Sequence, residues 1–203
     1  ADASAIEPHV LDLRDIEPIH GPLRACDAVV HLANLSGGAM PPQQLYSDNV
    51  RANAYVFQAA VDLGVAHLVY ASSVQVFAGN RYAGQTSEGQ ASCLRYLPLD
   101  GREPPCPGNA YAASKESGEA LLRYHAAQQP GLAATTVRWP LIADAERLAF
   151  YCQRAPAEKP LAYGMLDVGF TYLAVEDAAE FLVALLAAPQ PGYRSFLPAA
   201  EQN

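Results

Sequence analysis

Short runs of β-branched and other apolar residues alternate along this chain with longer segments whose apolar residues follow a helical spacing. The clearest strand-like runs are residues 27–35 and 65–72, and the segment between them, residues 43–63, has the helical spacing. Because strands that alternate with helices form parallel sheets, this order predicts an α/β protein.

The alternation continues beyond these elements. Gly64 stands where it would cap the end of the first helix, and a second helix over residues 111–129 stops at Pro130. Residues 79–109 are polar and rich in Gly and Pro, which is typical of a loop that covers a functional site. The remaining predicted elements are a strand end at residues 9–13, a strand at 134–138, helices at 145–154 and 174–188, and a last strand at 193–197.

Composition excludes several classes of protein. The 203 residues are 51% apolar and carry a net charge of −8, so the chain can bury a core but lacks the basic stripe of a general nucleic-acid binder. No run of about eighteen apolar residues occurs, so neither a membrane span nor a membrane partner is expected. The first residues are neither basic nor followed by an apolar region, which argues against a signal peptide.

The cysteines suggest neither a disulfide scaffold nor a metal site. They form no CxxC pair and no ligand spacing with the five histidines. We therefore expect reduced thiols, as in a cytoplasmic protein, with the one flanked by prolines an inert loop thiol. The four are Cys26, Cys93, Cys106 and Cys152.

Tyr111 and Lys115 stand four residues apart, on one face of the helix predicted for residues 111–129. A phenol with a pKa of about 10 is a poor base at neutral pH, and an ammonium one turn away favours the phenolate. The pair could move a proton to or from a substrate hydroxyl or carbonyl, and the lysine could hold the ribose of a nicotinamide cofactor. The alternative is an ordinary amphipathic helix with an incidental tyrosine and lysine. Because the chain has only two lysines and eleven tyrosines, about 0.1 pairs at this spacing are expected by chance.

Ser72 and Ser73 end the strand predicted at residues 65–72, at the edge where open α/β sheets bind ligands. A hydroxyl there could bond the same substrate oxygen that Tyr111 protonates. A serine pair after a strand is by itself more often turn chemistry. Together with the Tyr111 and Lys115 pair, it indicates a catalytic site.

With these residues in place, the chain resembles the extended short-chain dehydrogenase/reductase group, the NAD-dependent epimerase/dehydratase family. The similar stretches run in family order and cover most of the chain. They are DLRD (12–15), DAVVHLAN (27–34), Asn49 in SDNVRAN, GVAHLVYASSVQVFAG (64–79), YAASK (111–115), VRWPLIAD (137–144) and FTYLAVEDAAEFLVALL (170–186).

The resemblance implies a role for each matching position. It makes Ser73 the hydroxyl that orients the substrate, Tyr111 the general acid/base, and Lys115 the residue that lowers the pKa of the tyrosine and binds the nicotinamide ribose. The other implied cofactor-binding residues are Asp12 and Leu13 at the adenine, Leu32, Ala33 and Asn34 along the cofactor, Asn49 fixing that region, and Pro140 at the nicotinamide. Asn34 replaces the more usual Ala or Gly.

The chain also departs from the family pattern. No GxxGxxG or GxGxxG occurs, so the first strand, glycine-rich turn and first helix have no counterpart here. We favour a fragment of a longer protein over a natural truncation that no longer binds dinucleotide. Leu141 stands where many sugar-nucleotide enzymes carry Asn, and only 26 residues follow Asp177, which favours a smaller hydroxy or carbonyl compound as substrate.

The sequence therefore predicts an α/β, Rossmann-type doubly wound parallel sheet over residues 1–144, with a small C-terminal annex over 145–203 on the substrate side. The expected function is NAD- or NADP-dependent oxidoreduction or epimerisation of a sugar-like or other small hydroxy compound. The resemblance also implies a cytoplasmic homodimer, in which the helices at 43–63 and 111–129 form the interface between the two copies. The alternative is a non-catalytic binding or regulatory relative.

Overall fold

Four parallel strands form the central sheet of the computed structural model, which describes residues 6–36, 38–77, 99–147, 149 and 172–199. In spatial order they are β1 (Ala28–His31), β2 (His67–Ser73), β3 (Ala133–Trp139) and β6 (Gly192–Phe196). Every residue of β2 and β3 is buried, as expected for central strands of a parallel sheet. The predicted α/β, Rossmann-type fold is confirmed.

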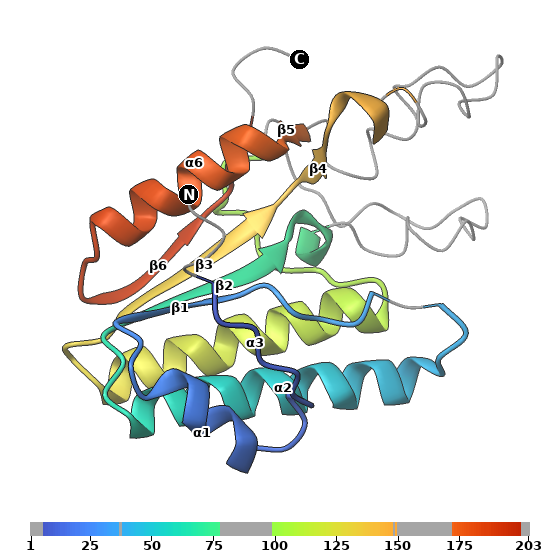
Figure 1. The fold of residues 1–203 in the computed structure, drawn as a ribbon. Helices are drawn as coiled ribbons and strands as arrows, with labels where there is room; N and C mark the ends of the chain where they lie inside the picture. The colour runs from blue at the N-terminus through green and yellow to red at the C-terminus, as the bar shows by residue number, and fades with distance from the viewer. Residues whose placement is uncertain (1–5, 37, 78–98, 148, 150–171, 200–203) are drawn as a thin grey trace, which may run out of the picture.

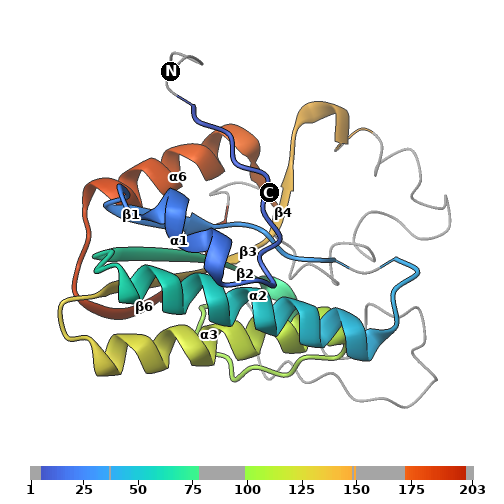
Figure 2. The ribbon, with the colours of Figure 1, turned by 60° about the horizontal axis from the view of Figure 1, so that its bottom comes forward.

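Helices cover both faces of the sheet (Figure 1). On one face lie α2 (Pro42–Asp62) and α3 (Ala110–Gln128), side by side in Figure 2, with the short α1 (Glu17–Leu23) against α2. The opposite face carries α6 (Val175–Ala187). The two faces enclose separate apolar cores, one around Phe57 and Tyr70 and the other around Val137 and Trp139.

Local chemistry explains where the two long helices begin and end. The backbone of Gly64 is left-handed, with φ of 72°, and Val65 N–H bonds the Ala60 carbonyl at 2.9 Å in a Schellman-type ending of α2. At the start of α3 the Asn109 side chain accepts a hydrogen bond from Ala112 N–H at 2.8 Å. Both helices match the segments predicted from spacing.

The strand end predicted at residues 9–13 is wrong. No strand is present there, and the side chain of Val10 is fully exposed. A strand needs a neighbour to accept its hydrogen bonds, and β1, which lies at the edge of the sheet, pairs only with β2. The strand predicted over 27–35 is likewise shortened to the residues that pair with β2.

The C-terminal part of the described chain contributes to the main sheet and to one of the layers that cover it. A two-stranded parallel ladder of β4 (Leu141–Ala143) and β5 (Tyr172–Ala174), which the sequence did not indicate, follows β3. β6 joins the main sheet beside β3, so the predicted boundary after residue 144 does not coincide with the edge of the sheet. Most of the helix predicted at 145–154 and of the loop at 79–109 lies outside the described residues, and the annex remains a prediction there.

The structure also bears on the predictions for the cysteines and for a membrane span. Cys106 is disulfide-bonded, so the prediction of an inert reduced thiol at this position is wrong, whereas Cys26 is free and exposed. Across the described ranges, none of the helices combines the length and apolar character that a membrane crossing requires.

Candidate active site at the carboxyl edge of the sheet

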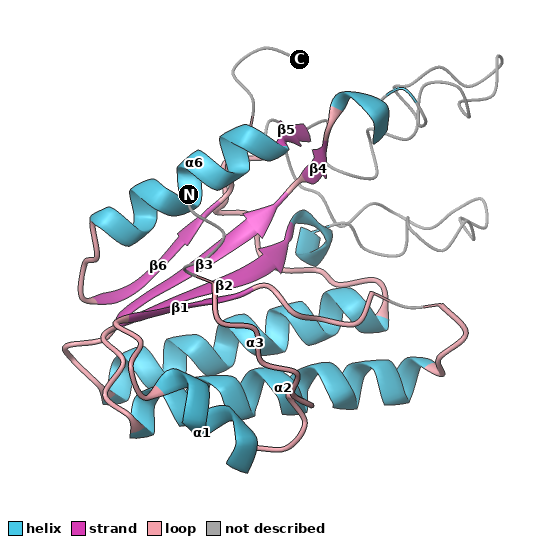
Figure 3. Ribbon diagram, in the orientation of Figure 1, coloured by secondary structure: helices cyan, strands magenta, loops and turns pink. Residues whose placement is uncertain are grey.

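The residues singled out from the sequence gather where the parallel strands end. Leu32, Ala33 and Asn34 follow β1, Ser73 is the last residue of β2, and the buried Pro140 follows β3. In a parallel sheet these ends share one edge, the edge toward which the arrows point in Figure 3. Leu32 and Ala33 are exposed there.

Lys115 reaches this edge from the first turns of α3. Its ammonium donates a hydrogen bond of 2.5 Å to the carbonyl of Ala71 in β2 and lies 5.1 Å from the ring centre of Tyr70 and 5.5 Å from that of Tyr111. The side chain is almost fully buried, and burial lowers its pKa from 10.5 to about 8. A charge held by one carbonyl and two ring faces is thus placed beside the phenol of Tyr111.

The Ser73 hydroxyl lies close enough to Tyr111 to act on its pKa through hydrogen bonding. Ser73 is 8% exposed, and its hydroxyl accepts a hydrogen bond of 3.2 Å from Gln75 N–H. Burial raises the pKa of Tyr111, and the bond with Ser73 lowers it only in part. The pKa of Tyr111 is therefore raised, whereas the spacing of Tyr111 and Lys115 predicted that it would be lowered. The cost of burying a phenolate is larger than the stabilisation that its neighbours provide.

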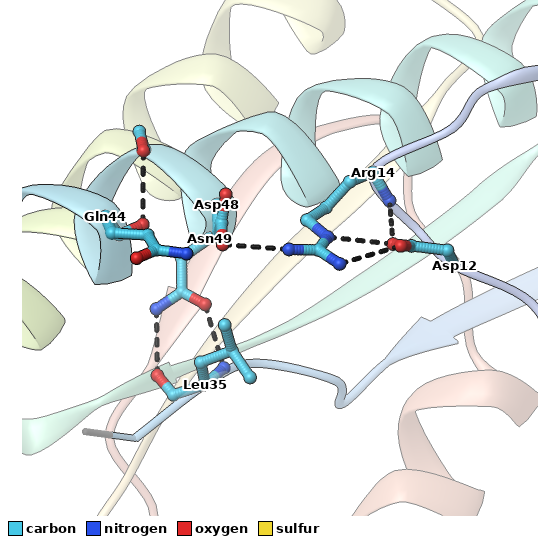
Figure 4. Close-up of polar contacts among 7 residues, drawn as sticks. Asp12, Arg14, Leu35, Gln44, Asp48 and Asn49 are labelled. Carbon is cyan, nitrogen blue, oxygen red and sulfur yellow. Dashed lines mark hydrogen bonds and ion pairs between the residues drawn. The ribbon is translucent and has the colours of Figure 1, made fainter. Parts of the chain in front are cut away.

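Asn49 fixes the backbone that follows β1. Its side chain is 1% exposed, and its amide group exchanges two hydrogen bonds of 2.8 Å with the backbone of Leu35 (Figure 4). The same amide donates to Ser114 of α3 at 3.1 Å. Asn49 therefore joins the loop at 32–35 to both helices of one face, and its role at the cofactor stays a prediction.

Asp12 and Leu13 lie on the N-terminal segment, and Arg14 ties that segment to α2. The Asp12 carboxylate accepts bonds from the Arg14 backbone N–H, Nε and Nη2 at 2.8–2.9 Å, which lower its pKa to about 2. The Arg14 Nη1 group bonds Asp48, the residue before Asn49, at 3.0 Å (Figure 4). Leu13 packs against the core under α2. Sequence reasoning missed Arg14 and Asp48, since nothing in the spacing of 14 and 48 pairs them.

A second polar chain, also missed, runs beneath the edge. His31 bonds Asn53 at 2.9 Å, and Asn53 donates to the Tyr70 hydroxyl at 3.1 Å. Burial lowers the pKa of His31 to about 4, so the imidazole is neutral and donates to the Asn53 oxygen. Asn34 Nδ2 also donates to Asn53, at 3.3 Å. The signal in the sequence was the spacing of Asn49 and Asn53, one helical turn apart.

The chain fits part of a dinucleotide. The nicotinamide half would suit an exposed strand end at 32–33, the loop behind it that Asn49 holds, and the buried ammonium beside Tyr111. Asn34 adds a buried amide oxygen that has no hydrogen-bond partner among the described residues. A glycine-rich turn for the pyrophosphate does not occur in the 203 residues. Within the described ranges no cluster of three or more His, Cys, Asp or Glu side chains could hold a metal ion.

Comparison with known proteins decides the family. The sequence model of the NAD-dependent epimerase/dehydratase family matches residues 1–196. The chain belongs to this family. The α/β fold that the sequence predicted is therefore the fold of the family. The predicted cofactor class, NAD or NADP, is also that of the family.

Two relatives come from Haloferax volcanii. The chain is 26% identical over 195 residues to an NAD-dependent glucose-6-phosphate dehydrogenase, covering 87% of this chain and 74% of the relative. It is 30% identical over 149 residues to an L-arabinose 1-dehydrogenase (NAD(P)(+)), covering 72% of this chain and 58% of the relative.

Solved structures share the fold at lower identity. A UDP-N-acetylglucosamine 4-epimerase from Bacillus cereus has a TM-score of 0.68 at 20% identity, covering 93% of this chain and 63% of its own. A uronate dehydrogenase from Agrobacterium tumefaciens has a TM-score of 0.67 at 21% identity, covering 97% and 64%. The chain thus spans a little under two thirds of these two proteins.

Proposed function

We propose that this chain carries the proton-transfer part of an NAD- or NADP-dependent oxidoreductase or epimerase that acts on a sugar-like hydroxy compound. The observation that supports it is the meeting of Ser73, Tyr111 and Lys115 at the carboxyl edge of the sheet. The two sequence relatives, which are named as dehydrogenases of glucose 6-phosphate and L-arabinose, favour a small sugar over a sugar nucleotide.

In this proposal Tyr111 moves the proton. When bound, the nicotinamide accepts or supplies the hydride at the substrate carbon. Ser73 donates to or accepts from the substrate oxygen and keeps it against the Tyr111 hydroxyl. During oxidation Tyr111 removes the hydroxyl proton, and during reduction it returns a proton to the carbonyl oxygen. The Lys115 ammonium stabilises the phenolate and donates to the ribose.

The pKa directions add a requirement to this mechanism. Burial keeps Tyr111 protonated at neutral pH, so oxidation needs a further stabilisation of the phenolate or a higher pH. We therefore expect the rate of oxidation to rise from neutrality to about pH 8, where Lys115 loses the charge that stabilises the phenolate.

We also expect a homodimer through the outer faces of α2 and α3. A cytoplasmic location stays a prediction, and the disulfide at Cys106 is at odds with a reducing compartment.

The alternative is a non-catalytic binding or regulatory relative. Such a relative would keep the fold without turnover. The catalytic proposal requires that NADH still binds.

Replacing Tyr111 by phenylalanine tests the choice. NADH binding would be followed by nicotinamide fluorescence, and NAD reduction would be followed with glucose 6-phosphate, L-arabinose or glucuronate. We expect Tyr111→Phe to lower kcat by about 10²–10⁴-fold with the Kd for NADH nearly unchanged. The control is Tyr124→Phe, which removes the hydroxyl of an exposed tyrosine on the same helix.

Two outcomes would contradict the catalytic proposal. A wild-type chain that binds no NADH would support the non-catalytic alternative. A Tyr111→Phe variant that turns over as fast as wild type would show that another group moves the proton.

A further inference from the structure

A buried ion pair lies one helical turn beyond Lys115. Arg138 of β3 donates to both carboxylate oxygens of Glu119 on α3, from Nε at 2.9 Å and from Nη2 at 2.7 Å. Their side chains are 7% and 1% exposed. A two-point contact of this kind fixes orientation as well as distance.

The Glu119 carboxylate also binds the end of β2. Ser72 donates its hydroxyl to Glu119 Oε1 at 2.6 Å. The guanidinium of Arg138 meanwhile donates to the carbonyl of Gly101 at 2.8 Å and lies over the ring of Phe77, 4.8 Å from its centre. One carboxylate thus joins α3, β2 and β3, and its partner extends the network to the segment that leads into α3.

The network borders Ser73 and Lys115 of the proposed proton-transfer site. Ser72 is the neighbour of Ser73 in the chain, and Glu119 follows Lys115 by one turn on α3. Successive residues of β2 are held by this one helix, Ala71 through its carbonyl by Lys115 and Ser72 through its hydroxyl by Glu119. The position of Ser73 relative to Tyr111 therefore depends on both bonds.

Stability alone does not account for such a network. A buried ion pair often contributes no more to stability than well-packed apolar side chains of similar volume, because removing both charges from water is costly. We propose that Glu119, held by Arg138, is a positioning residue that aligns Ser73 with Tyr111 through Ser72. This inference rests on the proposed function and deepens it.

Ser72→Ala tests the alignment with the least disturbance, since it removes one hydroxyl and leaves the ion pair in place. We expect kcat to fall about tenfold, with the Kd for NADH within about twofold of wild type and Tm nearly unchanged. The control is Ser117→Ala, which removes a hydroxyl that bonds Ala113 and Tyr46 on the outer side of α3. A kcat of Ser72→Ala within twofold of wild type would overturn the inference.

A double variant separates alignment from stability. Glu119→Met together with Arg138→Met removes both charges, so neither is left buried without a partner. We expect this variant to fold cooperatively and to keep a kcat at least tenfold below wild type. Wild-type kcat in the folded double variant would reduce the network to a structural role and overturn the inference.

Amide hydrogen exchange keeps the test independent of turnover. In Ser72→Ala we expect faster exchange in residues 73–77 and at the start of α3, with the exchange of β3 unchanged. If the wild-type chain binds no NADH, the proposed function fails, while the exchange pattern still decides whether Glu119 aligns these elements. Unchanged exchange in both segments would contradict the alignment.

Discussion

Lys115 shows how one buried residue can carry both the chemistry and a stability cost. Its ammonium is offered one carbonyl, from Ala71, and the faces of two tyrosine rings, and burial lowers its pKa to about 8. At neutral pH the charge is therefore kept at the expense of folding free energy. Such a loss of stability is expected where a buried charge serves the chemistry of a site.

The free energy of unfolding should reveal that cost through its dependence on pH. Between pH 8 and pH 10 the unfolded chain holds a proton that folded Lys115 has lost, so the stability of the wild type gains from this residue as the pH rises. Over this interval we expect Lys115 to raise the free energy of unfolding of the wild type by roughly 2 kcal/mol. The Lys115→Met variant should lack this rise. Urea unfolding of both proteins at several pH values measures the difference, and parallel curves would contradict it.

At the scale of elements, α3 is the helix that organises the site, and its contact with β2 is unusually close at Gly118. A Cβ at this position would overlap the hydroxyl and ring of the fully buried Tyr70, with Cζ only 2.6 Å away. The sequence predicted the helix but not the reason for the glycine, which depends on a side chain from another element. The same holds for Glu119, whose partners Ser72 and Arg138 lie on two strands.

Gly118→Ala should therefore run against the usual helix preference. Alanine is ordinarily favoured over glycine inside a helix by up to about 1 kcal/mol. We expect Gly118→Ala instead to destabilise the protein by about 1–3 kcal/mol through overpacking against Tyr70. Thermal and urea unfolding measure the change, and a stabilising Gly118→Ala would show that Tyr70 moves freely.

At the scale of the whole molecule, the sheet separates two cores and leaves different surfaces on its two sides. α2 and α3 lie together on one side, bridged by a hydrogen bond of 3.0 Å between Tyr46 and Ser117, and Tyr124 stands 57% exposed on α3. On the other side α6 exposes Val183. The homodimer expected from the resemblance would use the first of these surfaces.

Charge placed on each surface distinguishes them. Tyr124→Glu puts like charges into an interface formed by α3 of both copies, so we expect it to shift a dimer to monomers in sedimentation velocity. Val183→Glu on α6 is the matched control and should leave the sedimentation coefficient unchanged. A wild-type monomer, or dissociation by Val183→Glu alone, would contradict the proposed interface.

The sequence by itself determined what depends on neighbours along the chain. The helical spacing located α2 and α3 at 43–63 and 111–129, with Gly64 at the end of α2. The four-residue spacing placed Tyr111 and Lys115 on one face of α3. These signals are local because a helix satisfies its own hydrogen bonds and repeats its faces within a few residues.

Only the tertiary structure decided what depends on residues distant in the chain. Residues 9–13 have the composition of a strand, but they form none because a strand takes its hydrogen bonds from a neighbour and no described segment supplies one. The clamp of Asn49 on Leu35, the tie from Arg14 to Asp48 and the ion pair of Glu119 with Arg138 each join different elements. Packing creates such pairs, and it also decides their charge states: burial, which no spacing reveals, raised the pKa of Tyr111 and lowered that of Lys115.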